Sequence, residues 1–212
     1  MKFVFLLLLL FIVSLPVFAK IEIEPYRKKY FWDNSWNDAI SNEIDQKINN
    51  DMITEYIDQD DLISLGCPGF NSADADSKKD FWIVFLSSLA RAESAFNTKV
   101  RSRAPKGGHG NYGLLQLSKA TAREQCGIND PKDIADPAMH LRCGVKLLAW
   151  QLKGAPVTET KFLRPDLKGQ LFGKYILLWG PLRQNDKRGR ALLVSWFKKH
   201  LDQMPFCSIK AE

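Results

Sequence analysis

Apolar residues in this chain recur at the three- and four-residue spacing of amphipathic helices, and no stretch shows sustained strand-like alternation. A strongly apolar helix is expected over residues 78–96, where Ser77 and Asp80 have capping-box spacing. Asp136-Pro137 is a typical helix start. Further helices are expected over 170–179 and 190–201, and on one face formed by Trp36, Ile40, Ile44 and Ile48. The pattern predicts a mainly α fold, a helical bundle with at most a short β-hairpin in the glycine-rich stretch 101–115.

The N-terminus carries the features of a secretory signal peptide. Residues 3–19 form a nearly unbroken apolar run behind Lys2, with the small residue Ala19 at a suitable cleavage point. The run is short for a membrane span and Pro16 interrupts it, so an uncleaved anchor is the weaker alternative. The sequence thus predicts export to the periplasm or the medium, an N-terminal helical extension over 20–76, and one larger domain over 77–212.

The chain is basic, with a formal net charge of +6, which falls to +5 without the signal peptide and its single lysine. A basic exported protein suits an anionic partner, although the charge could equally serve solubility alone. The basic residues are dispersed and form no nucleic-acid motif, so no nucleic-acid partner is expected. A monomer without a stable membrane anchor is expected.

Four cysteines lie beyond the signal peptide, and an even count in an exported chain indicates disulfides. Of the three possible connectivities, Cys126–Cys143 as a local bridge and Cys67–Cys207 across the domain are preferred. A zinc site on Cys126, His140 and Cys143 is the alternative, but only His140 and Cys143 are close in sequence. No metal or cofactor is expected.

Glu93 is the candidate catalytic residue. At helical spacing its neighbours are apolar: Trp82, Leu86, Leu89 and Phe96. Burial disfavours the charged carboxylate and raises its pKa, which suits a general acid near neutral pH. The alternative is a glutamate at the edge of the apolar stripe whose head reaches water.

The residues around Glu93 resemble a known family. Ala92-Glu93-Ser94-Ala95-Phe96-Asn97, a glycine-rich loop, and then Tyr112-Gly113-Leu114-Leu115-Gln116-Leu117 are similar to the lysozyme-like soluble lytic transglycosylases of glycoside hydrolase family 23, which includes goose-type lysozymes. The resemblance covers about residues 78–185. It implies a mostly helical α+β lysozyme-like fold around a glycan cleft, and cleavage of peptidoglycan between N-acetylmuramic acid and N-acetylglucosamine.

The resemblance also implies roles for particular residues. Glu93 would protonate the leaving oxygen, and Ser94 would help to order the site. The substrate-binding residues would be Tyr112, Gly113, Leu114, Leu115 and Gln116. A turn role for Gly113 and core packing for Leu114 and Leu115 remain equally open.

Two departures from the usual glycosidase or family pattern bear on the mechanism. No acidic residue lies between Glu93 and Glu124, whereas glycosidases usually use two carboxylates. A single acid suits transglycosylation, in which the substrate's acetamido oxygen attacks C1. A later carboxylate, Asp130, Asp133 or Asp136, could still reach the cleft and support hydrolysis.

The family's later Ala-Tyr-Asn motif is also absent. Tyr175-Ile176-Leu177-Leu178-Trp179 stands in its place, and Tyr175 or Trp179 is the candidate replacement. The loss of polar contacts there suggests a preference for a modified, de-N-acetylated glycan.

A non-catalytic peptidoglycan-binding module is the alternative function. Residues 183–190 are expected to form a solvated turn.

Overall fold

The structure is a computed structural model that describes residues 20–102, 110–130, 132–154, 167–174, 176 and 178–208. Its α-helices are α1 (Trp36–Ile44), α2 (Asp51–Thr54), α3 (Gln59–Leu65), α4 (Ala75–Ser94), α5 (Lys119–Cys126), α6 (Pro137–Leu152) and α7 (Lys187–Lys198). Strands β1 (Asn111–Tyr112) and β2 (Leu117–Ser118) form the one sheet seen in these residues. The predicted mainly α fold with a short hairpin is confirmed. The predicted signal peptide and Tyr175 lie outside the described residues.

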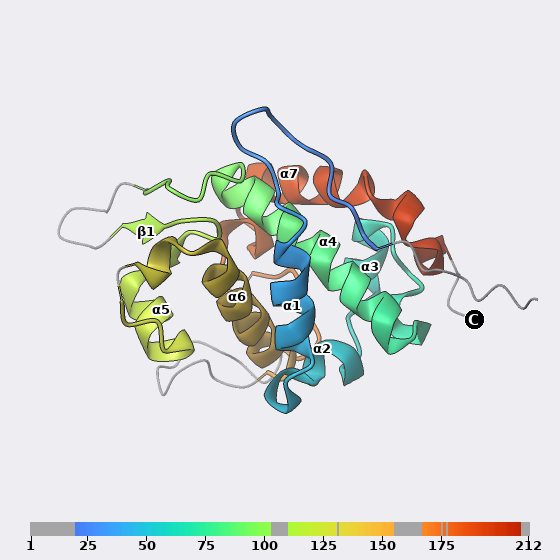
Figure 1. Cartoon of the computed structure of the whole chain (residues 1–212). Coiled ribbons are helices and arrows are strands. Elements are labelled where there is room, and N and C mark those ends of the chain that lie inside the picture. Colours follow the sequence, from blue (N-terminus) through green and yellow to red (C-terminus); the bar gives the residue numbers. More distant parts are fainter. Residues whose placement is uncertain are drawn as a thin grey trace, which may run out of the picture.

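Helix α4 runs through the middle of the molecule, with α7 packed along it and α1 crossing it (Figure 1). Its Phe81, Trp82 and Phe85 side chains are fully buried and lie in edge-on or stacked contact with one another. The helix starts earlier than predicted because Asp74, and not Ser77, caps it by accepting a hydrogen bond from the Ser77 N–H. Helix α4 therefore anchors the core and carries Glu93 on its last turn.

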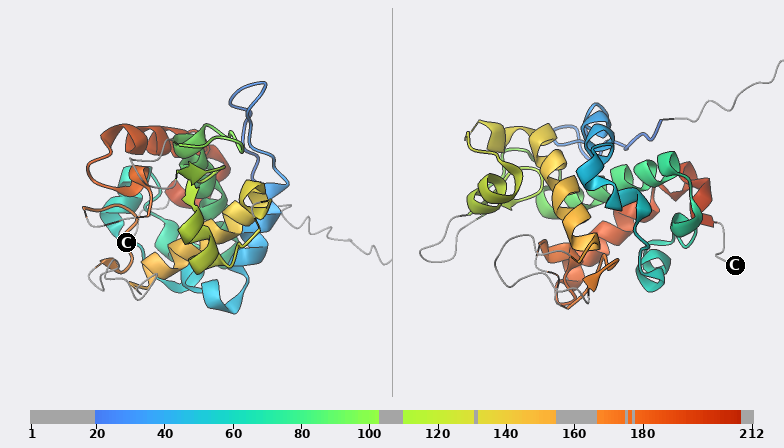
Figure 2. Two further views of the ribbon diagram at one scale, coloured as in Figure 1. Left: turned by 90° about the vertical axis from the view of Figure 1, so that its left-hand side faces the viewer. Right: turned by 90° about the horizontal axis from the view of Figure 1, so that it is seen from below.

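Helix α5, the hairpin and the start of α6 gather at one end of the molecule, and α3 lies toward the other end (Figures 1 and 2). Asp136 caps α6 as predicted, accepting a hydrogen bond from Ala138 N–H, with Pro137 in the first turn. The Cys126–Cys143 disulfide joins α5 to α6. It uses both sulfurs that the alternative zinc site would need. The hairpin pairs Asn111 with Ser118 and Tyr112 with Leu117, so it lies slightly later in the chain than predicted.

The N-terminal part packs on the rest of the chain through α1 and α2 against α6 and through α3 against α7. The Cys67–Cys207 disulfide adds a covalent link between residues 140 positions apart. The predicted apolar face of the first helix is correct for Ile40 and Ile44 but wrong for Ile48, which is 60% exposed because α1 ends at Ile44. The boundary at residue 76 between extension and domain stays a prediction. None of the described helices is long and apolar enough to cross a membrane.

The helix predicted over 170–179 is wrong: the described residues of this segment form bends and one isolated bridge instead. Several backbone N–H groups of this segment donate hydrogen bonds to residues outside it, and not to one another. The Asp61 carboxylate of α3 accepts hydrogen bonds from the N–H groups of Leu171 (2.7 Å) and Phe172 (3.1 Å). Gly173 bridges in parallel to Arg183, with Gly173 N–H donating to Leu182 O. A short 3-10 turn, η5 (Gly180–Leu182), follows. Long-range partners therefore override the local apolar pattern.

Candidate active site

Glu93 lies at the C-terminal end of α4, where the chain turns sharply. Ala95 and Phe96 both have left-handed backbone angles, with φ of 52° and 63°. Such angles cost energy for residues other than glycine and persist only where surrounding contacts enforce them. Phe96 supplies those contacts: it is buried and packs edge-on against Tyr26, Trp32 and Trp196. This packing fixes the end of α4 and with it the position of Glu93.

The Glu93 side chain is only half-buried, but its environment favours the protonated form. Burial and, second, the negative charge of Asp186 raise the pKa of Glu93 to about 7. The positive charge of Arg183 and a hydrogen bond from the Gly180 N–H act in the opposite direction. A carboxyl with a pKa near neutrality can give up a proton and take it back at physiological pH.

Gly180 lies between the two carboxyl groups. A Cβ atom on Gly180 would lie 2.7 Å from Asp186 Oδ2 and 3.9 Å from Glu93 Oε1. The two carboxylate oxygens are therefore separated by no more than the sum of these distances. Asp186 is held in place because its Oδ1 caps α7 and accepts the Gly189 N–H at 2.8 Å. The absence of a side chain at Gly180 lets both carboxyl groups face the same small space.

Sequence reasoning missed Asp186. The solvated turn predicted over 183–190 is correct for Gln184 and Asn185 but wrong from Lys187 onward, where α7 begins and Arg190 donates a 2.7 Å hydrogen bond to Leu182 O. Asp186 is recognisable in sequence as a helix cap, but its approach to Glu93 depends on tertiary packing. It is the carboxylate whose charge acts on Glu93. Two of the three candidates named from sequence, Asp130 and Asp136, instead accept hydrogen bonds from nearby backbone N–H groups.

The segment Gly113–Gln116 forms the turn of the hairpin. Leu114 and Leu115 are fully buried, so their side chains pack in the core. Gly113 has a φ of +68°, and a Cβ there would lie 2.7 Å from the His140 ring. The Gln116 side-chain amide closes the turn by donating to Gly113 O at 2.9 Å. The shape of this turn therefore depends on all four residues.

Of the remaining predicted site residues that the structure describes, two are buried and make hydrogen bonds, and one is half-buried. Trp179 is buried, and its indole N–H donates to Leu115 O at 2.8 Å. Ser94 is also buried and donates its hydroxyl to Ala90 O. Tyr112 is half-buried, with the Arg101 guanidinium 4.8 Å and the Lys119 ammonium 5.4 Å from its ring centre. The structure thus links Trp179 to the hairpin turn and places two positively charged side chains near the Tyr112 ring.

No cluster of three or more His, Cys, Asp or Glu residues that could hold a metal ion occurs in the described part of the chain. His140 lies beside the hairpin turn, where burial lowers its pKa. Its ring nitrogens face the Ile134 carbonyl oxygen and the Leu115 N–H. His140 therefore supports the turn.

The fold is thus helical with a small hairpin, and a half-buried glutamate with a raised pKa lies at the end of its central helix. Residues 70–162 match the family model described as Transglycosylase SLT domain. These residues are therefore similar to the SLT family of peptidoglycan-cleaving lytic transglycosylases, and the resemblance seen in the sequence is confirmed. The SLT match implies that the substrate is the glycan of peptidoglycan.

Solved structures of Bd0314 DslA share the fold. A glutamate-to-glutamine mutant of that protein is 24% identical, with a TM-score of 0.63 over 86% of this chain and 98% of that one. A second glutamate-to-glutamine mutant is 26% identical, with a TM-score of 0.59 over 78% and 89% of the two chains. No curated protein matches the chain.

Proposed function

We propose that this chain is an exported enzyme that cleaves the β-1,4 bond between N-acetylmuramic acid and N-acetylglucosamine in peptidoglycan, with Glu93 as general acid and then general base. The observation that carries the proposal is the Glu93 carboxyl, fixed at the end of α4 with a pKa raised to about 7. Export is supported by the predicted signal peptide over residues 1–19 and by two disulfides, which are typical of oxidising compartments.

The surroundings of Glu93 suit both halves of such a reaction. Before bond cleavage, burial and the charge of Asp186 keep the carboxyl protonated, so it can give its proton to the leaving glycosidic oxygen. After transfer, the Gly180 N–H and the positive charge of Arg183 stabilise the carboxylate. The carboxylate can then take a proton from the sugar hydroxyl or the water that attacks C1 in the second half of the reaction. Burial and Asp186 raise the pKa of Glu93, whereas Arg183 and the Gly180 N–H lower it. The resulting pKa of about 7 lets the carboxyl both donate a proton and accept one.

The attacking group decides the product. With an N-acetylated muramic acid, the acetamido oxygen can attack C1, and the sugar's own hydroxyl then closes an anhydro ring. With a de-N-acetylated sugar this route is lost, and a water must attack in its place. Asp186 favours the second possibility, because its carboxylate faces the same space as Glu93 and offers a hydrogen-bond acceptor for a water. We therefore include a preference for de-N-acetylated glycan in the proposal.

The test is mass spectrometry of the products from purified cell walls, before and after de-N-acetylation. The proposal expects cleavage of both walls, faster cleavage of the de-N-acetylated wall, and reducing ends rather than anhydro ends on its products. Equal or faster cleavage of the fully acetylated wall would rule out the substrate preference. No cleavage of either wall by protein with both disulfides intact would rule out the enzyme assignment itself.

A further inference from the structure

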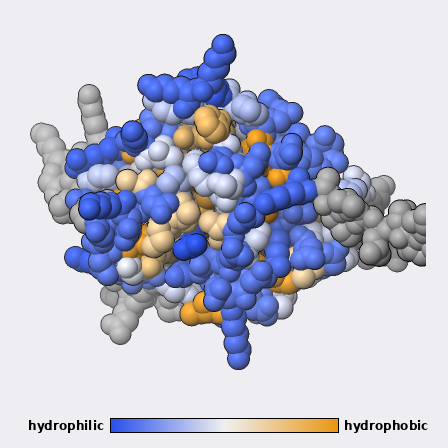
Figure 3. Space-filling model, in the orientation of Figure 1, coloured by the Kyte–Doolittle hydropathy of each residue, from blue (hydrophilic) through white to orange (hydrophobic). Residues whose placement is uncertain are grey.

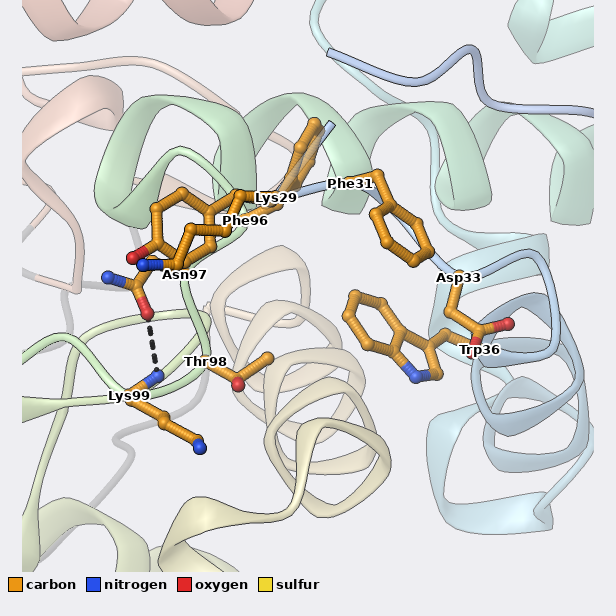
Figure 4. Close-up of a pocket in the computed structure, with 9 residues that line it drawn as sticks. Lys29, Phe31, Asp33, Trp36, Phe96, Asn97, Thr98 and Lys99 are labelled. Atoms are coloured by element: carbon orange, nitrogen blue, oxygen red, sulfur yellow. Dashed lines mark hydrogen bonds between the residues drawn. The ribbon is translucent and has the colours of Figure 1, made fainter. Parts of the chain in front are cut away.

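A hollow of about 460 Å³ lies next to the turn that follows Glu93 (Figure 4). The N-terminal segment forms one side of it through Lys29, Phe31 and Trp36. The loop 96–99 forms the other side. The N-terminal segment lies outside residues 70–162, so half of this hollow does not come from the SLT domain match.

The two sides of the hollow differ in chemistry. Phe31 and Trp36 present aromatic rings to it, and Asn97, Thr98 and Lys99 present polar groups from the opposite side (Figure 4). The Phe31 residue is 49% exposed, so its ring is available for contact with a ligand. The Asn97 side-chain oxygen accepts the Lys99 N–H at 3.0 Å. Within the described residues, the Asn97 amide NH₂ and the Thr98 hydroxyl have no hydrogen-bond partner.

A second hollow of about 500 Å³ adjoins the first and shares Phe31 and Asp33 with it. Phe31 thus stands between the two. The first hollow has two exposed lysines, Lys29 and Lys99, whereas the second has two exposed glutamates, Glu22 and Glu24. The face of the molecule seen in Figure 3 is mostly hydrophilic, with scattered apolar residues. The two lysines therefore lie in the first hollow and the two glutamates in the second, with Phe31 and the exposed Asp33 shared between them.

This arrangement fits a short ligand that carries free carboxylates, an aliphatic stretch and a free amine. From these features we propose that the two hollows bind the peptide stem of peptidoglycan, with its carboxylates at Lys29 and Lys99, its aliphatic side chain against Phe31, and its amine at Glu22 and Glu24. The stem hangs from the muramic acid at the bond that is cleaved, and the first hollow begins three residues after Glu93. The inference rests on the proposed function for the identity of the ligand.

The test measures binding without turnover, in a Glu93→Gln background. The ligands are a soluble disaccharide-peptide, the same disaccharide after an amidase has removed the stem, and the free stem peptide. Titration calorimetry is run on the parent and on Phe31→Ser, Lys99→Glu and Glu24→Lys. Tyr56→Ser serves as the matched control, since Tyr56 is 65% exposed and lines neither hollow.

The inference expects each of the three substitutions to weaken binding of the stem-bearing ligands at least about fivefold, a loss of about 1 kcal/mol. The control should leave binding unchanged, and no variant should change binding of the stem-free disaccharide. Thermal melting checks that all variants stay folded.

Unchanged stem binding in all three folded variants would overturn the inference. So would equal weakening of the stem-free disaccharide, because the hollows would then bind glycan. Neither result concerns cleavage by the protein with Glu93 intact, so the cleavage assay tests the proposed function independently. If one variant unfolds, the other two still decide the question.

Discussion

The indole N–H of Trp179 donates a hydrogen bond to the carbonyl oxygen of Leu115 at 2.8 Å. This bond joins the segment that stands in place of the family's later motif to the hairpin turn Gly113–Gln116. Both partners are buried, so water cannot replace the donor if it is removed. Trp179 therefore acts on the site through the backbone of the turn.

Trp179→Phe should lower the free energy of unfolding by about 1–3 kcal/mol, because Leu115 O loses its buried donor. Activity on cell walls should fall with it, since the turn is no longer held. Denaturant titration and turbidity assays measure the two effects. Wild-type stability in Trp179→Phe would show that the bond contributes nothing to holding the turn.

Asp186→Asn should shift the pH dependence of cleavage. Burial is the larger cause of the raised pKa of Glu93, and the negative charge of Asp186 is the second. Removing that charge lowers the pKa, so the alkaline limb of the rate profile should move to lower pH by less than about 1 unit. Asp202→Asn, a change on the distant 3-10 turn Leu201–Gln203, is the control and should leave the profile in place. An unchanged profile in Asp186→Asn would contradict the electrostatic coupling.

Glu93→Gln should change how stability depends on pH. The folded-state pKa of Glu93 is raised from 4.5 to about 7, so folding favours the protonated form. The cost of ionising the carboxyl is absent below about pH 4.5 and grows as pH rises through 7. Glu93→Gln should therefore melt like wild type at pH 4 but be more stable at pH 8, by about 1–3 kcal/mol. Melting curves at both pH values check this, and equal stability at pH 8 would count against a raised pKa.

The two disulfides should leave no reactive thiol in the folded, unreduced protein. Each is expected to contribute about 2–4 kcal/mol, with the larger effect for Cys67–Cys207, whose loop spans 140 residues against 17 for Cys126–Cys143. Thiol titration and melting with and without reductant measure both points. Two or more reactive thiols in unreduced protein would show that the pairing does not form.

The helices that could be predicted are those whose local sequence and tertiary role agree. Helix α6 has a capping aspartate, a proline in the first turn and a buried apolar face, and each of these signals is local. The segment 170–179 is apolar enough for a helix, but Asp61, more than a hundred residues earlier, takes two of its N–H groups. A partner so distant along the chain does not change the spacing of apolar residues from which helices are predicted.

The same distinction holds at the site. The apolar neighbours of Glu93 on its own helix indicate burial, and the raised pKa has burial as its largest cause. Asp186 and Gly180 reach Glu93 only because the chain folds back along α4, and their sequence features are those of an ordinary helix cap and turn. Long-range approach of two carboxyl groups could not be predicted from spacing.

The central claim is that Glu93 transfers the proton, and the most direct measurement is the cleavage rate of purified peptidoglycan by Glu93→Gln at neutral pH. Glutamine preserves the shape of the side chain but cannot donate or accept the proton, and general acid–base catalysis contributes about 10²–10⁴-fold. The account predicts a fall in rate of at least about 100-fold in a variant with wild-type circular dichroism. A rate within about tenfold of wild type would contradict it.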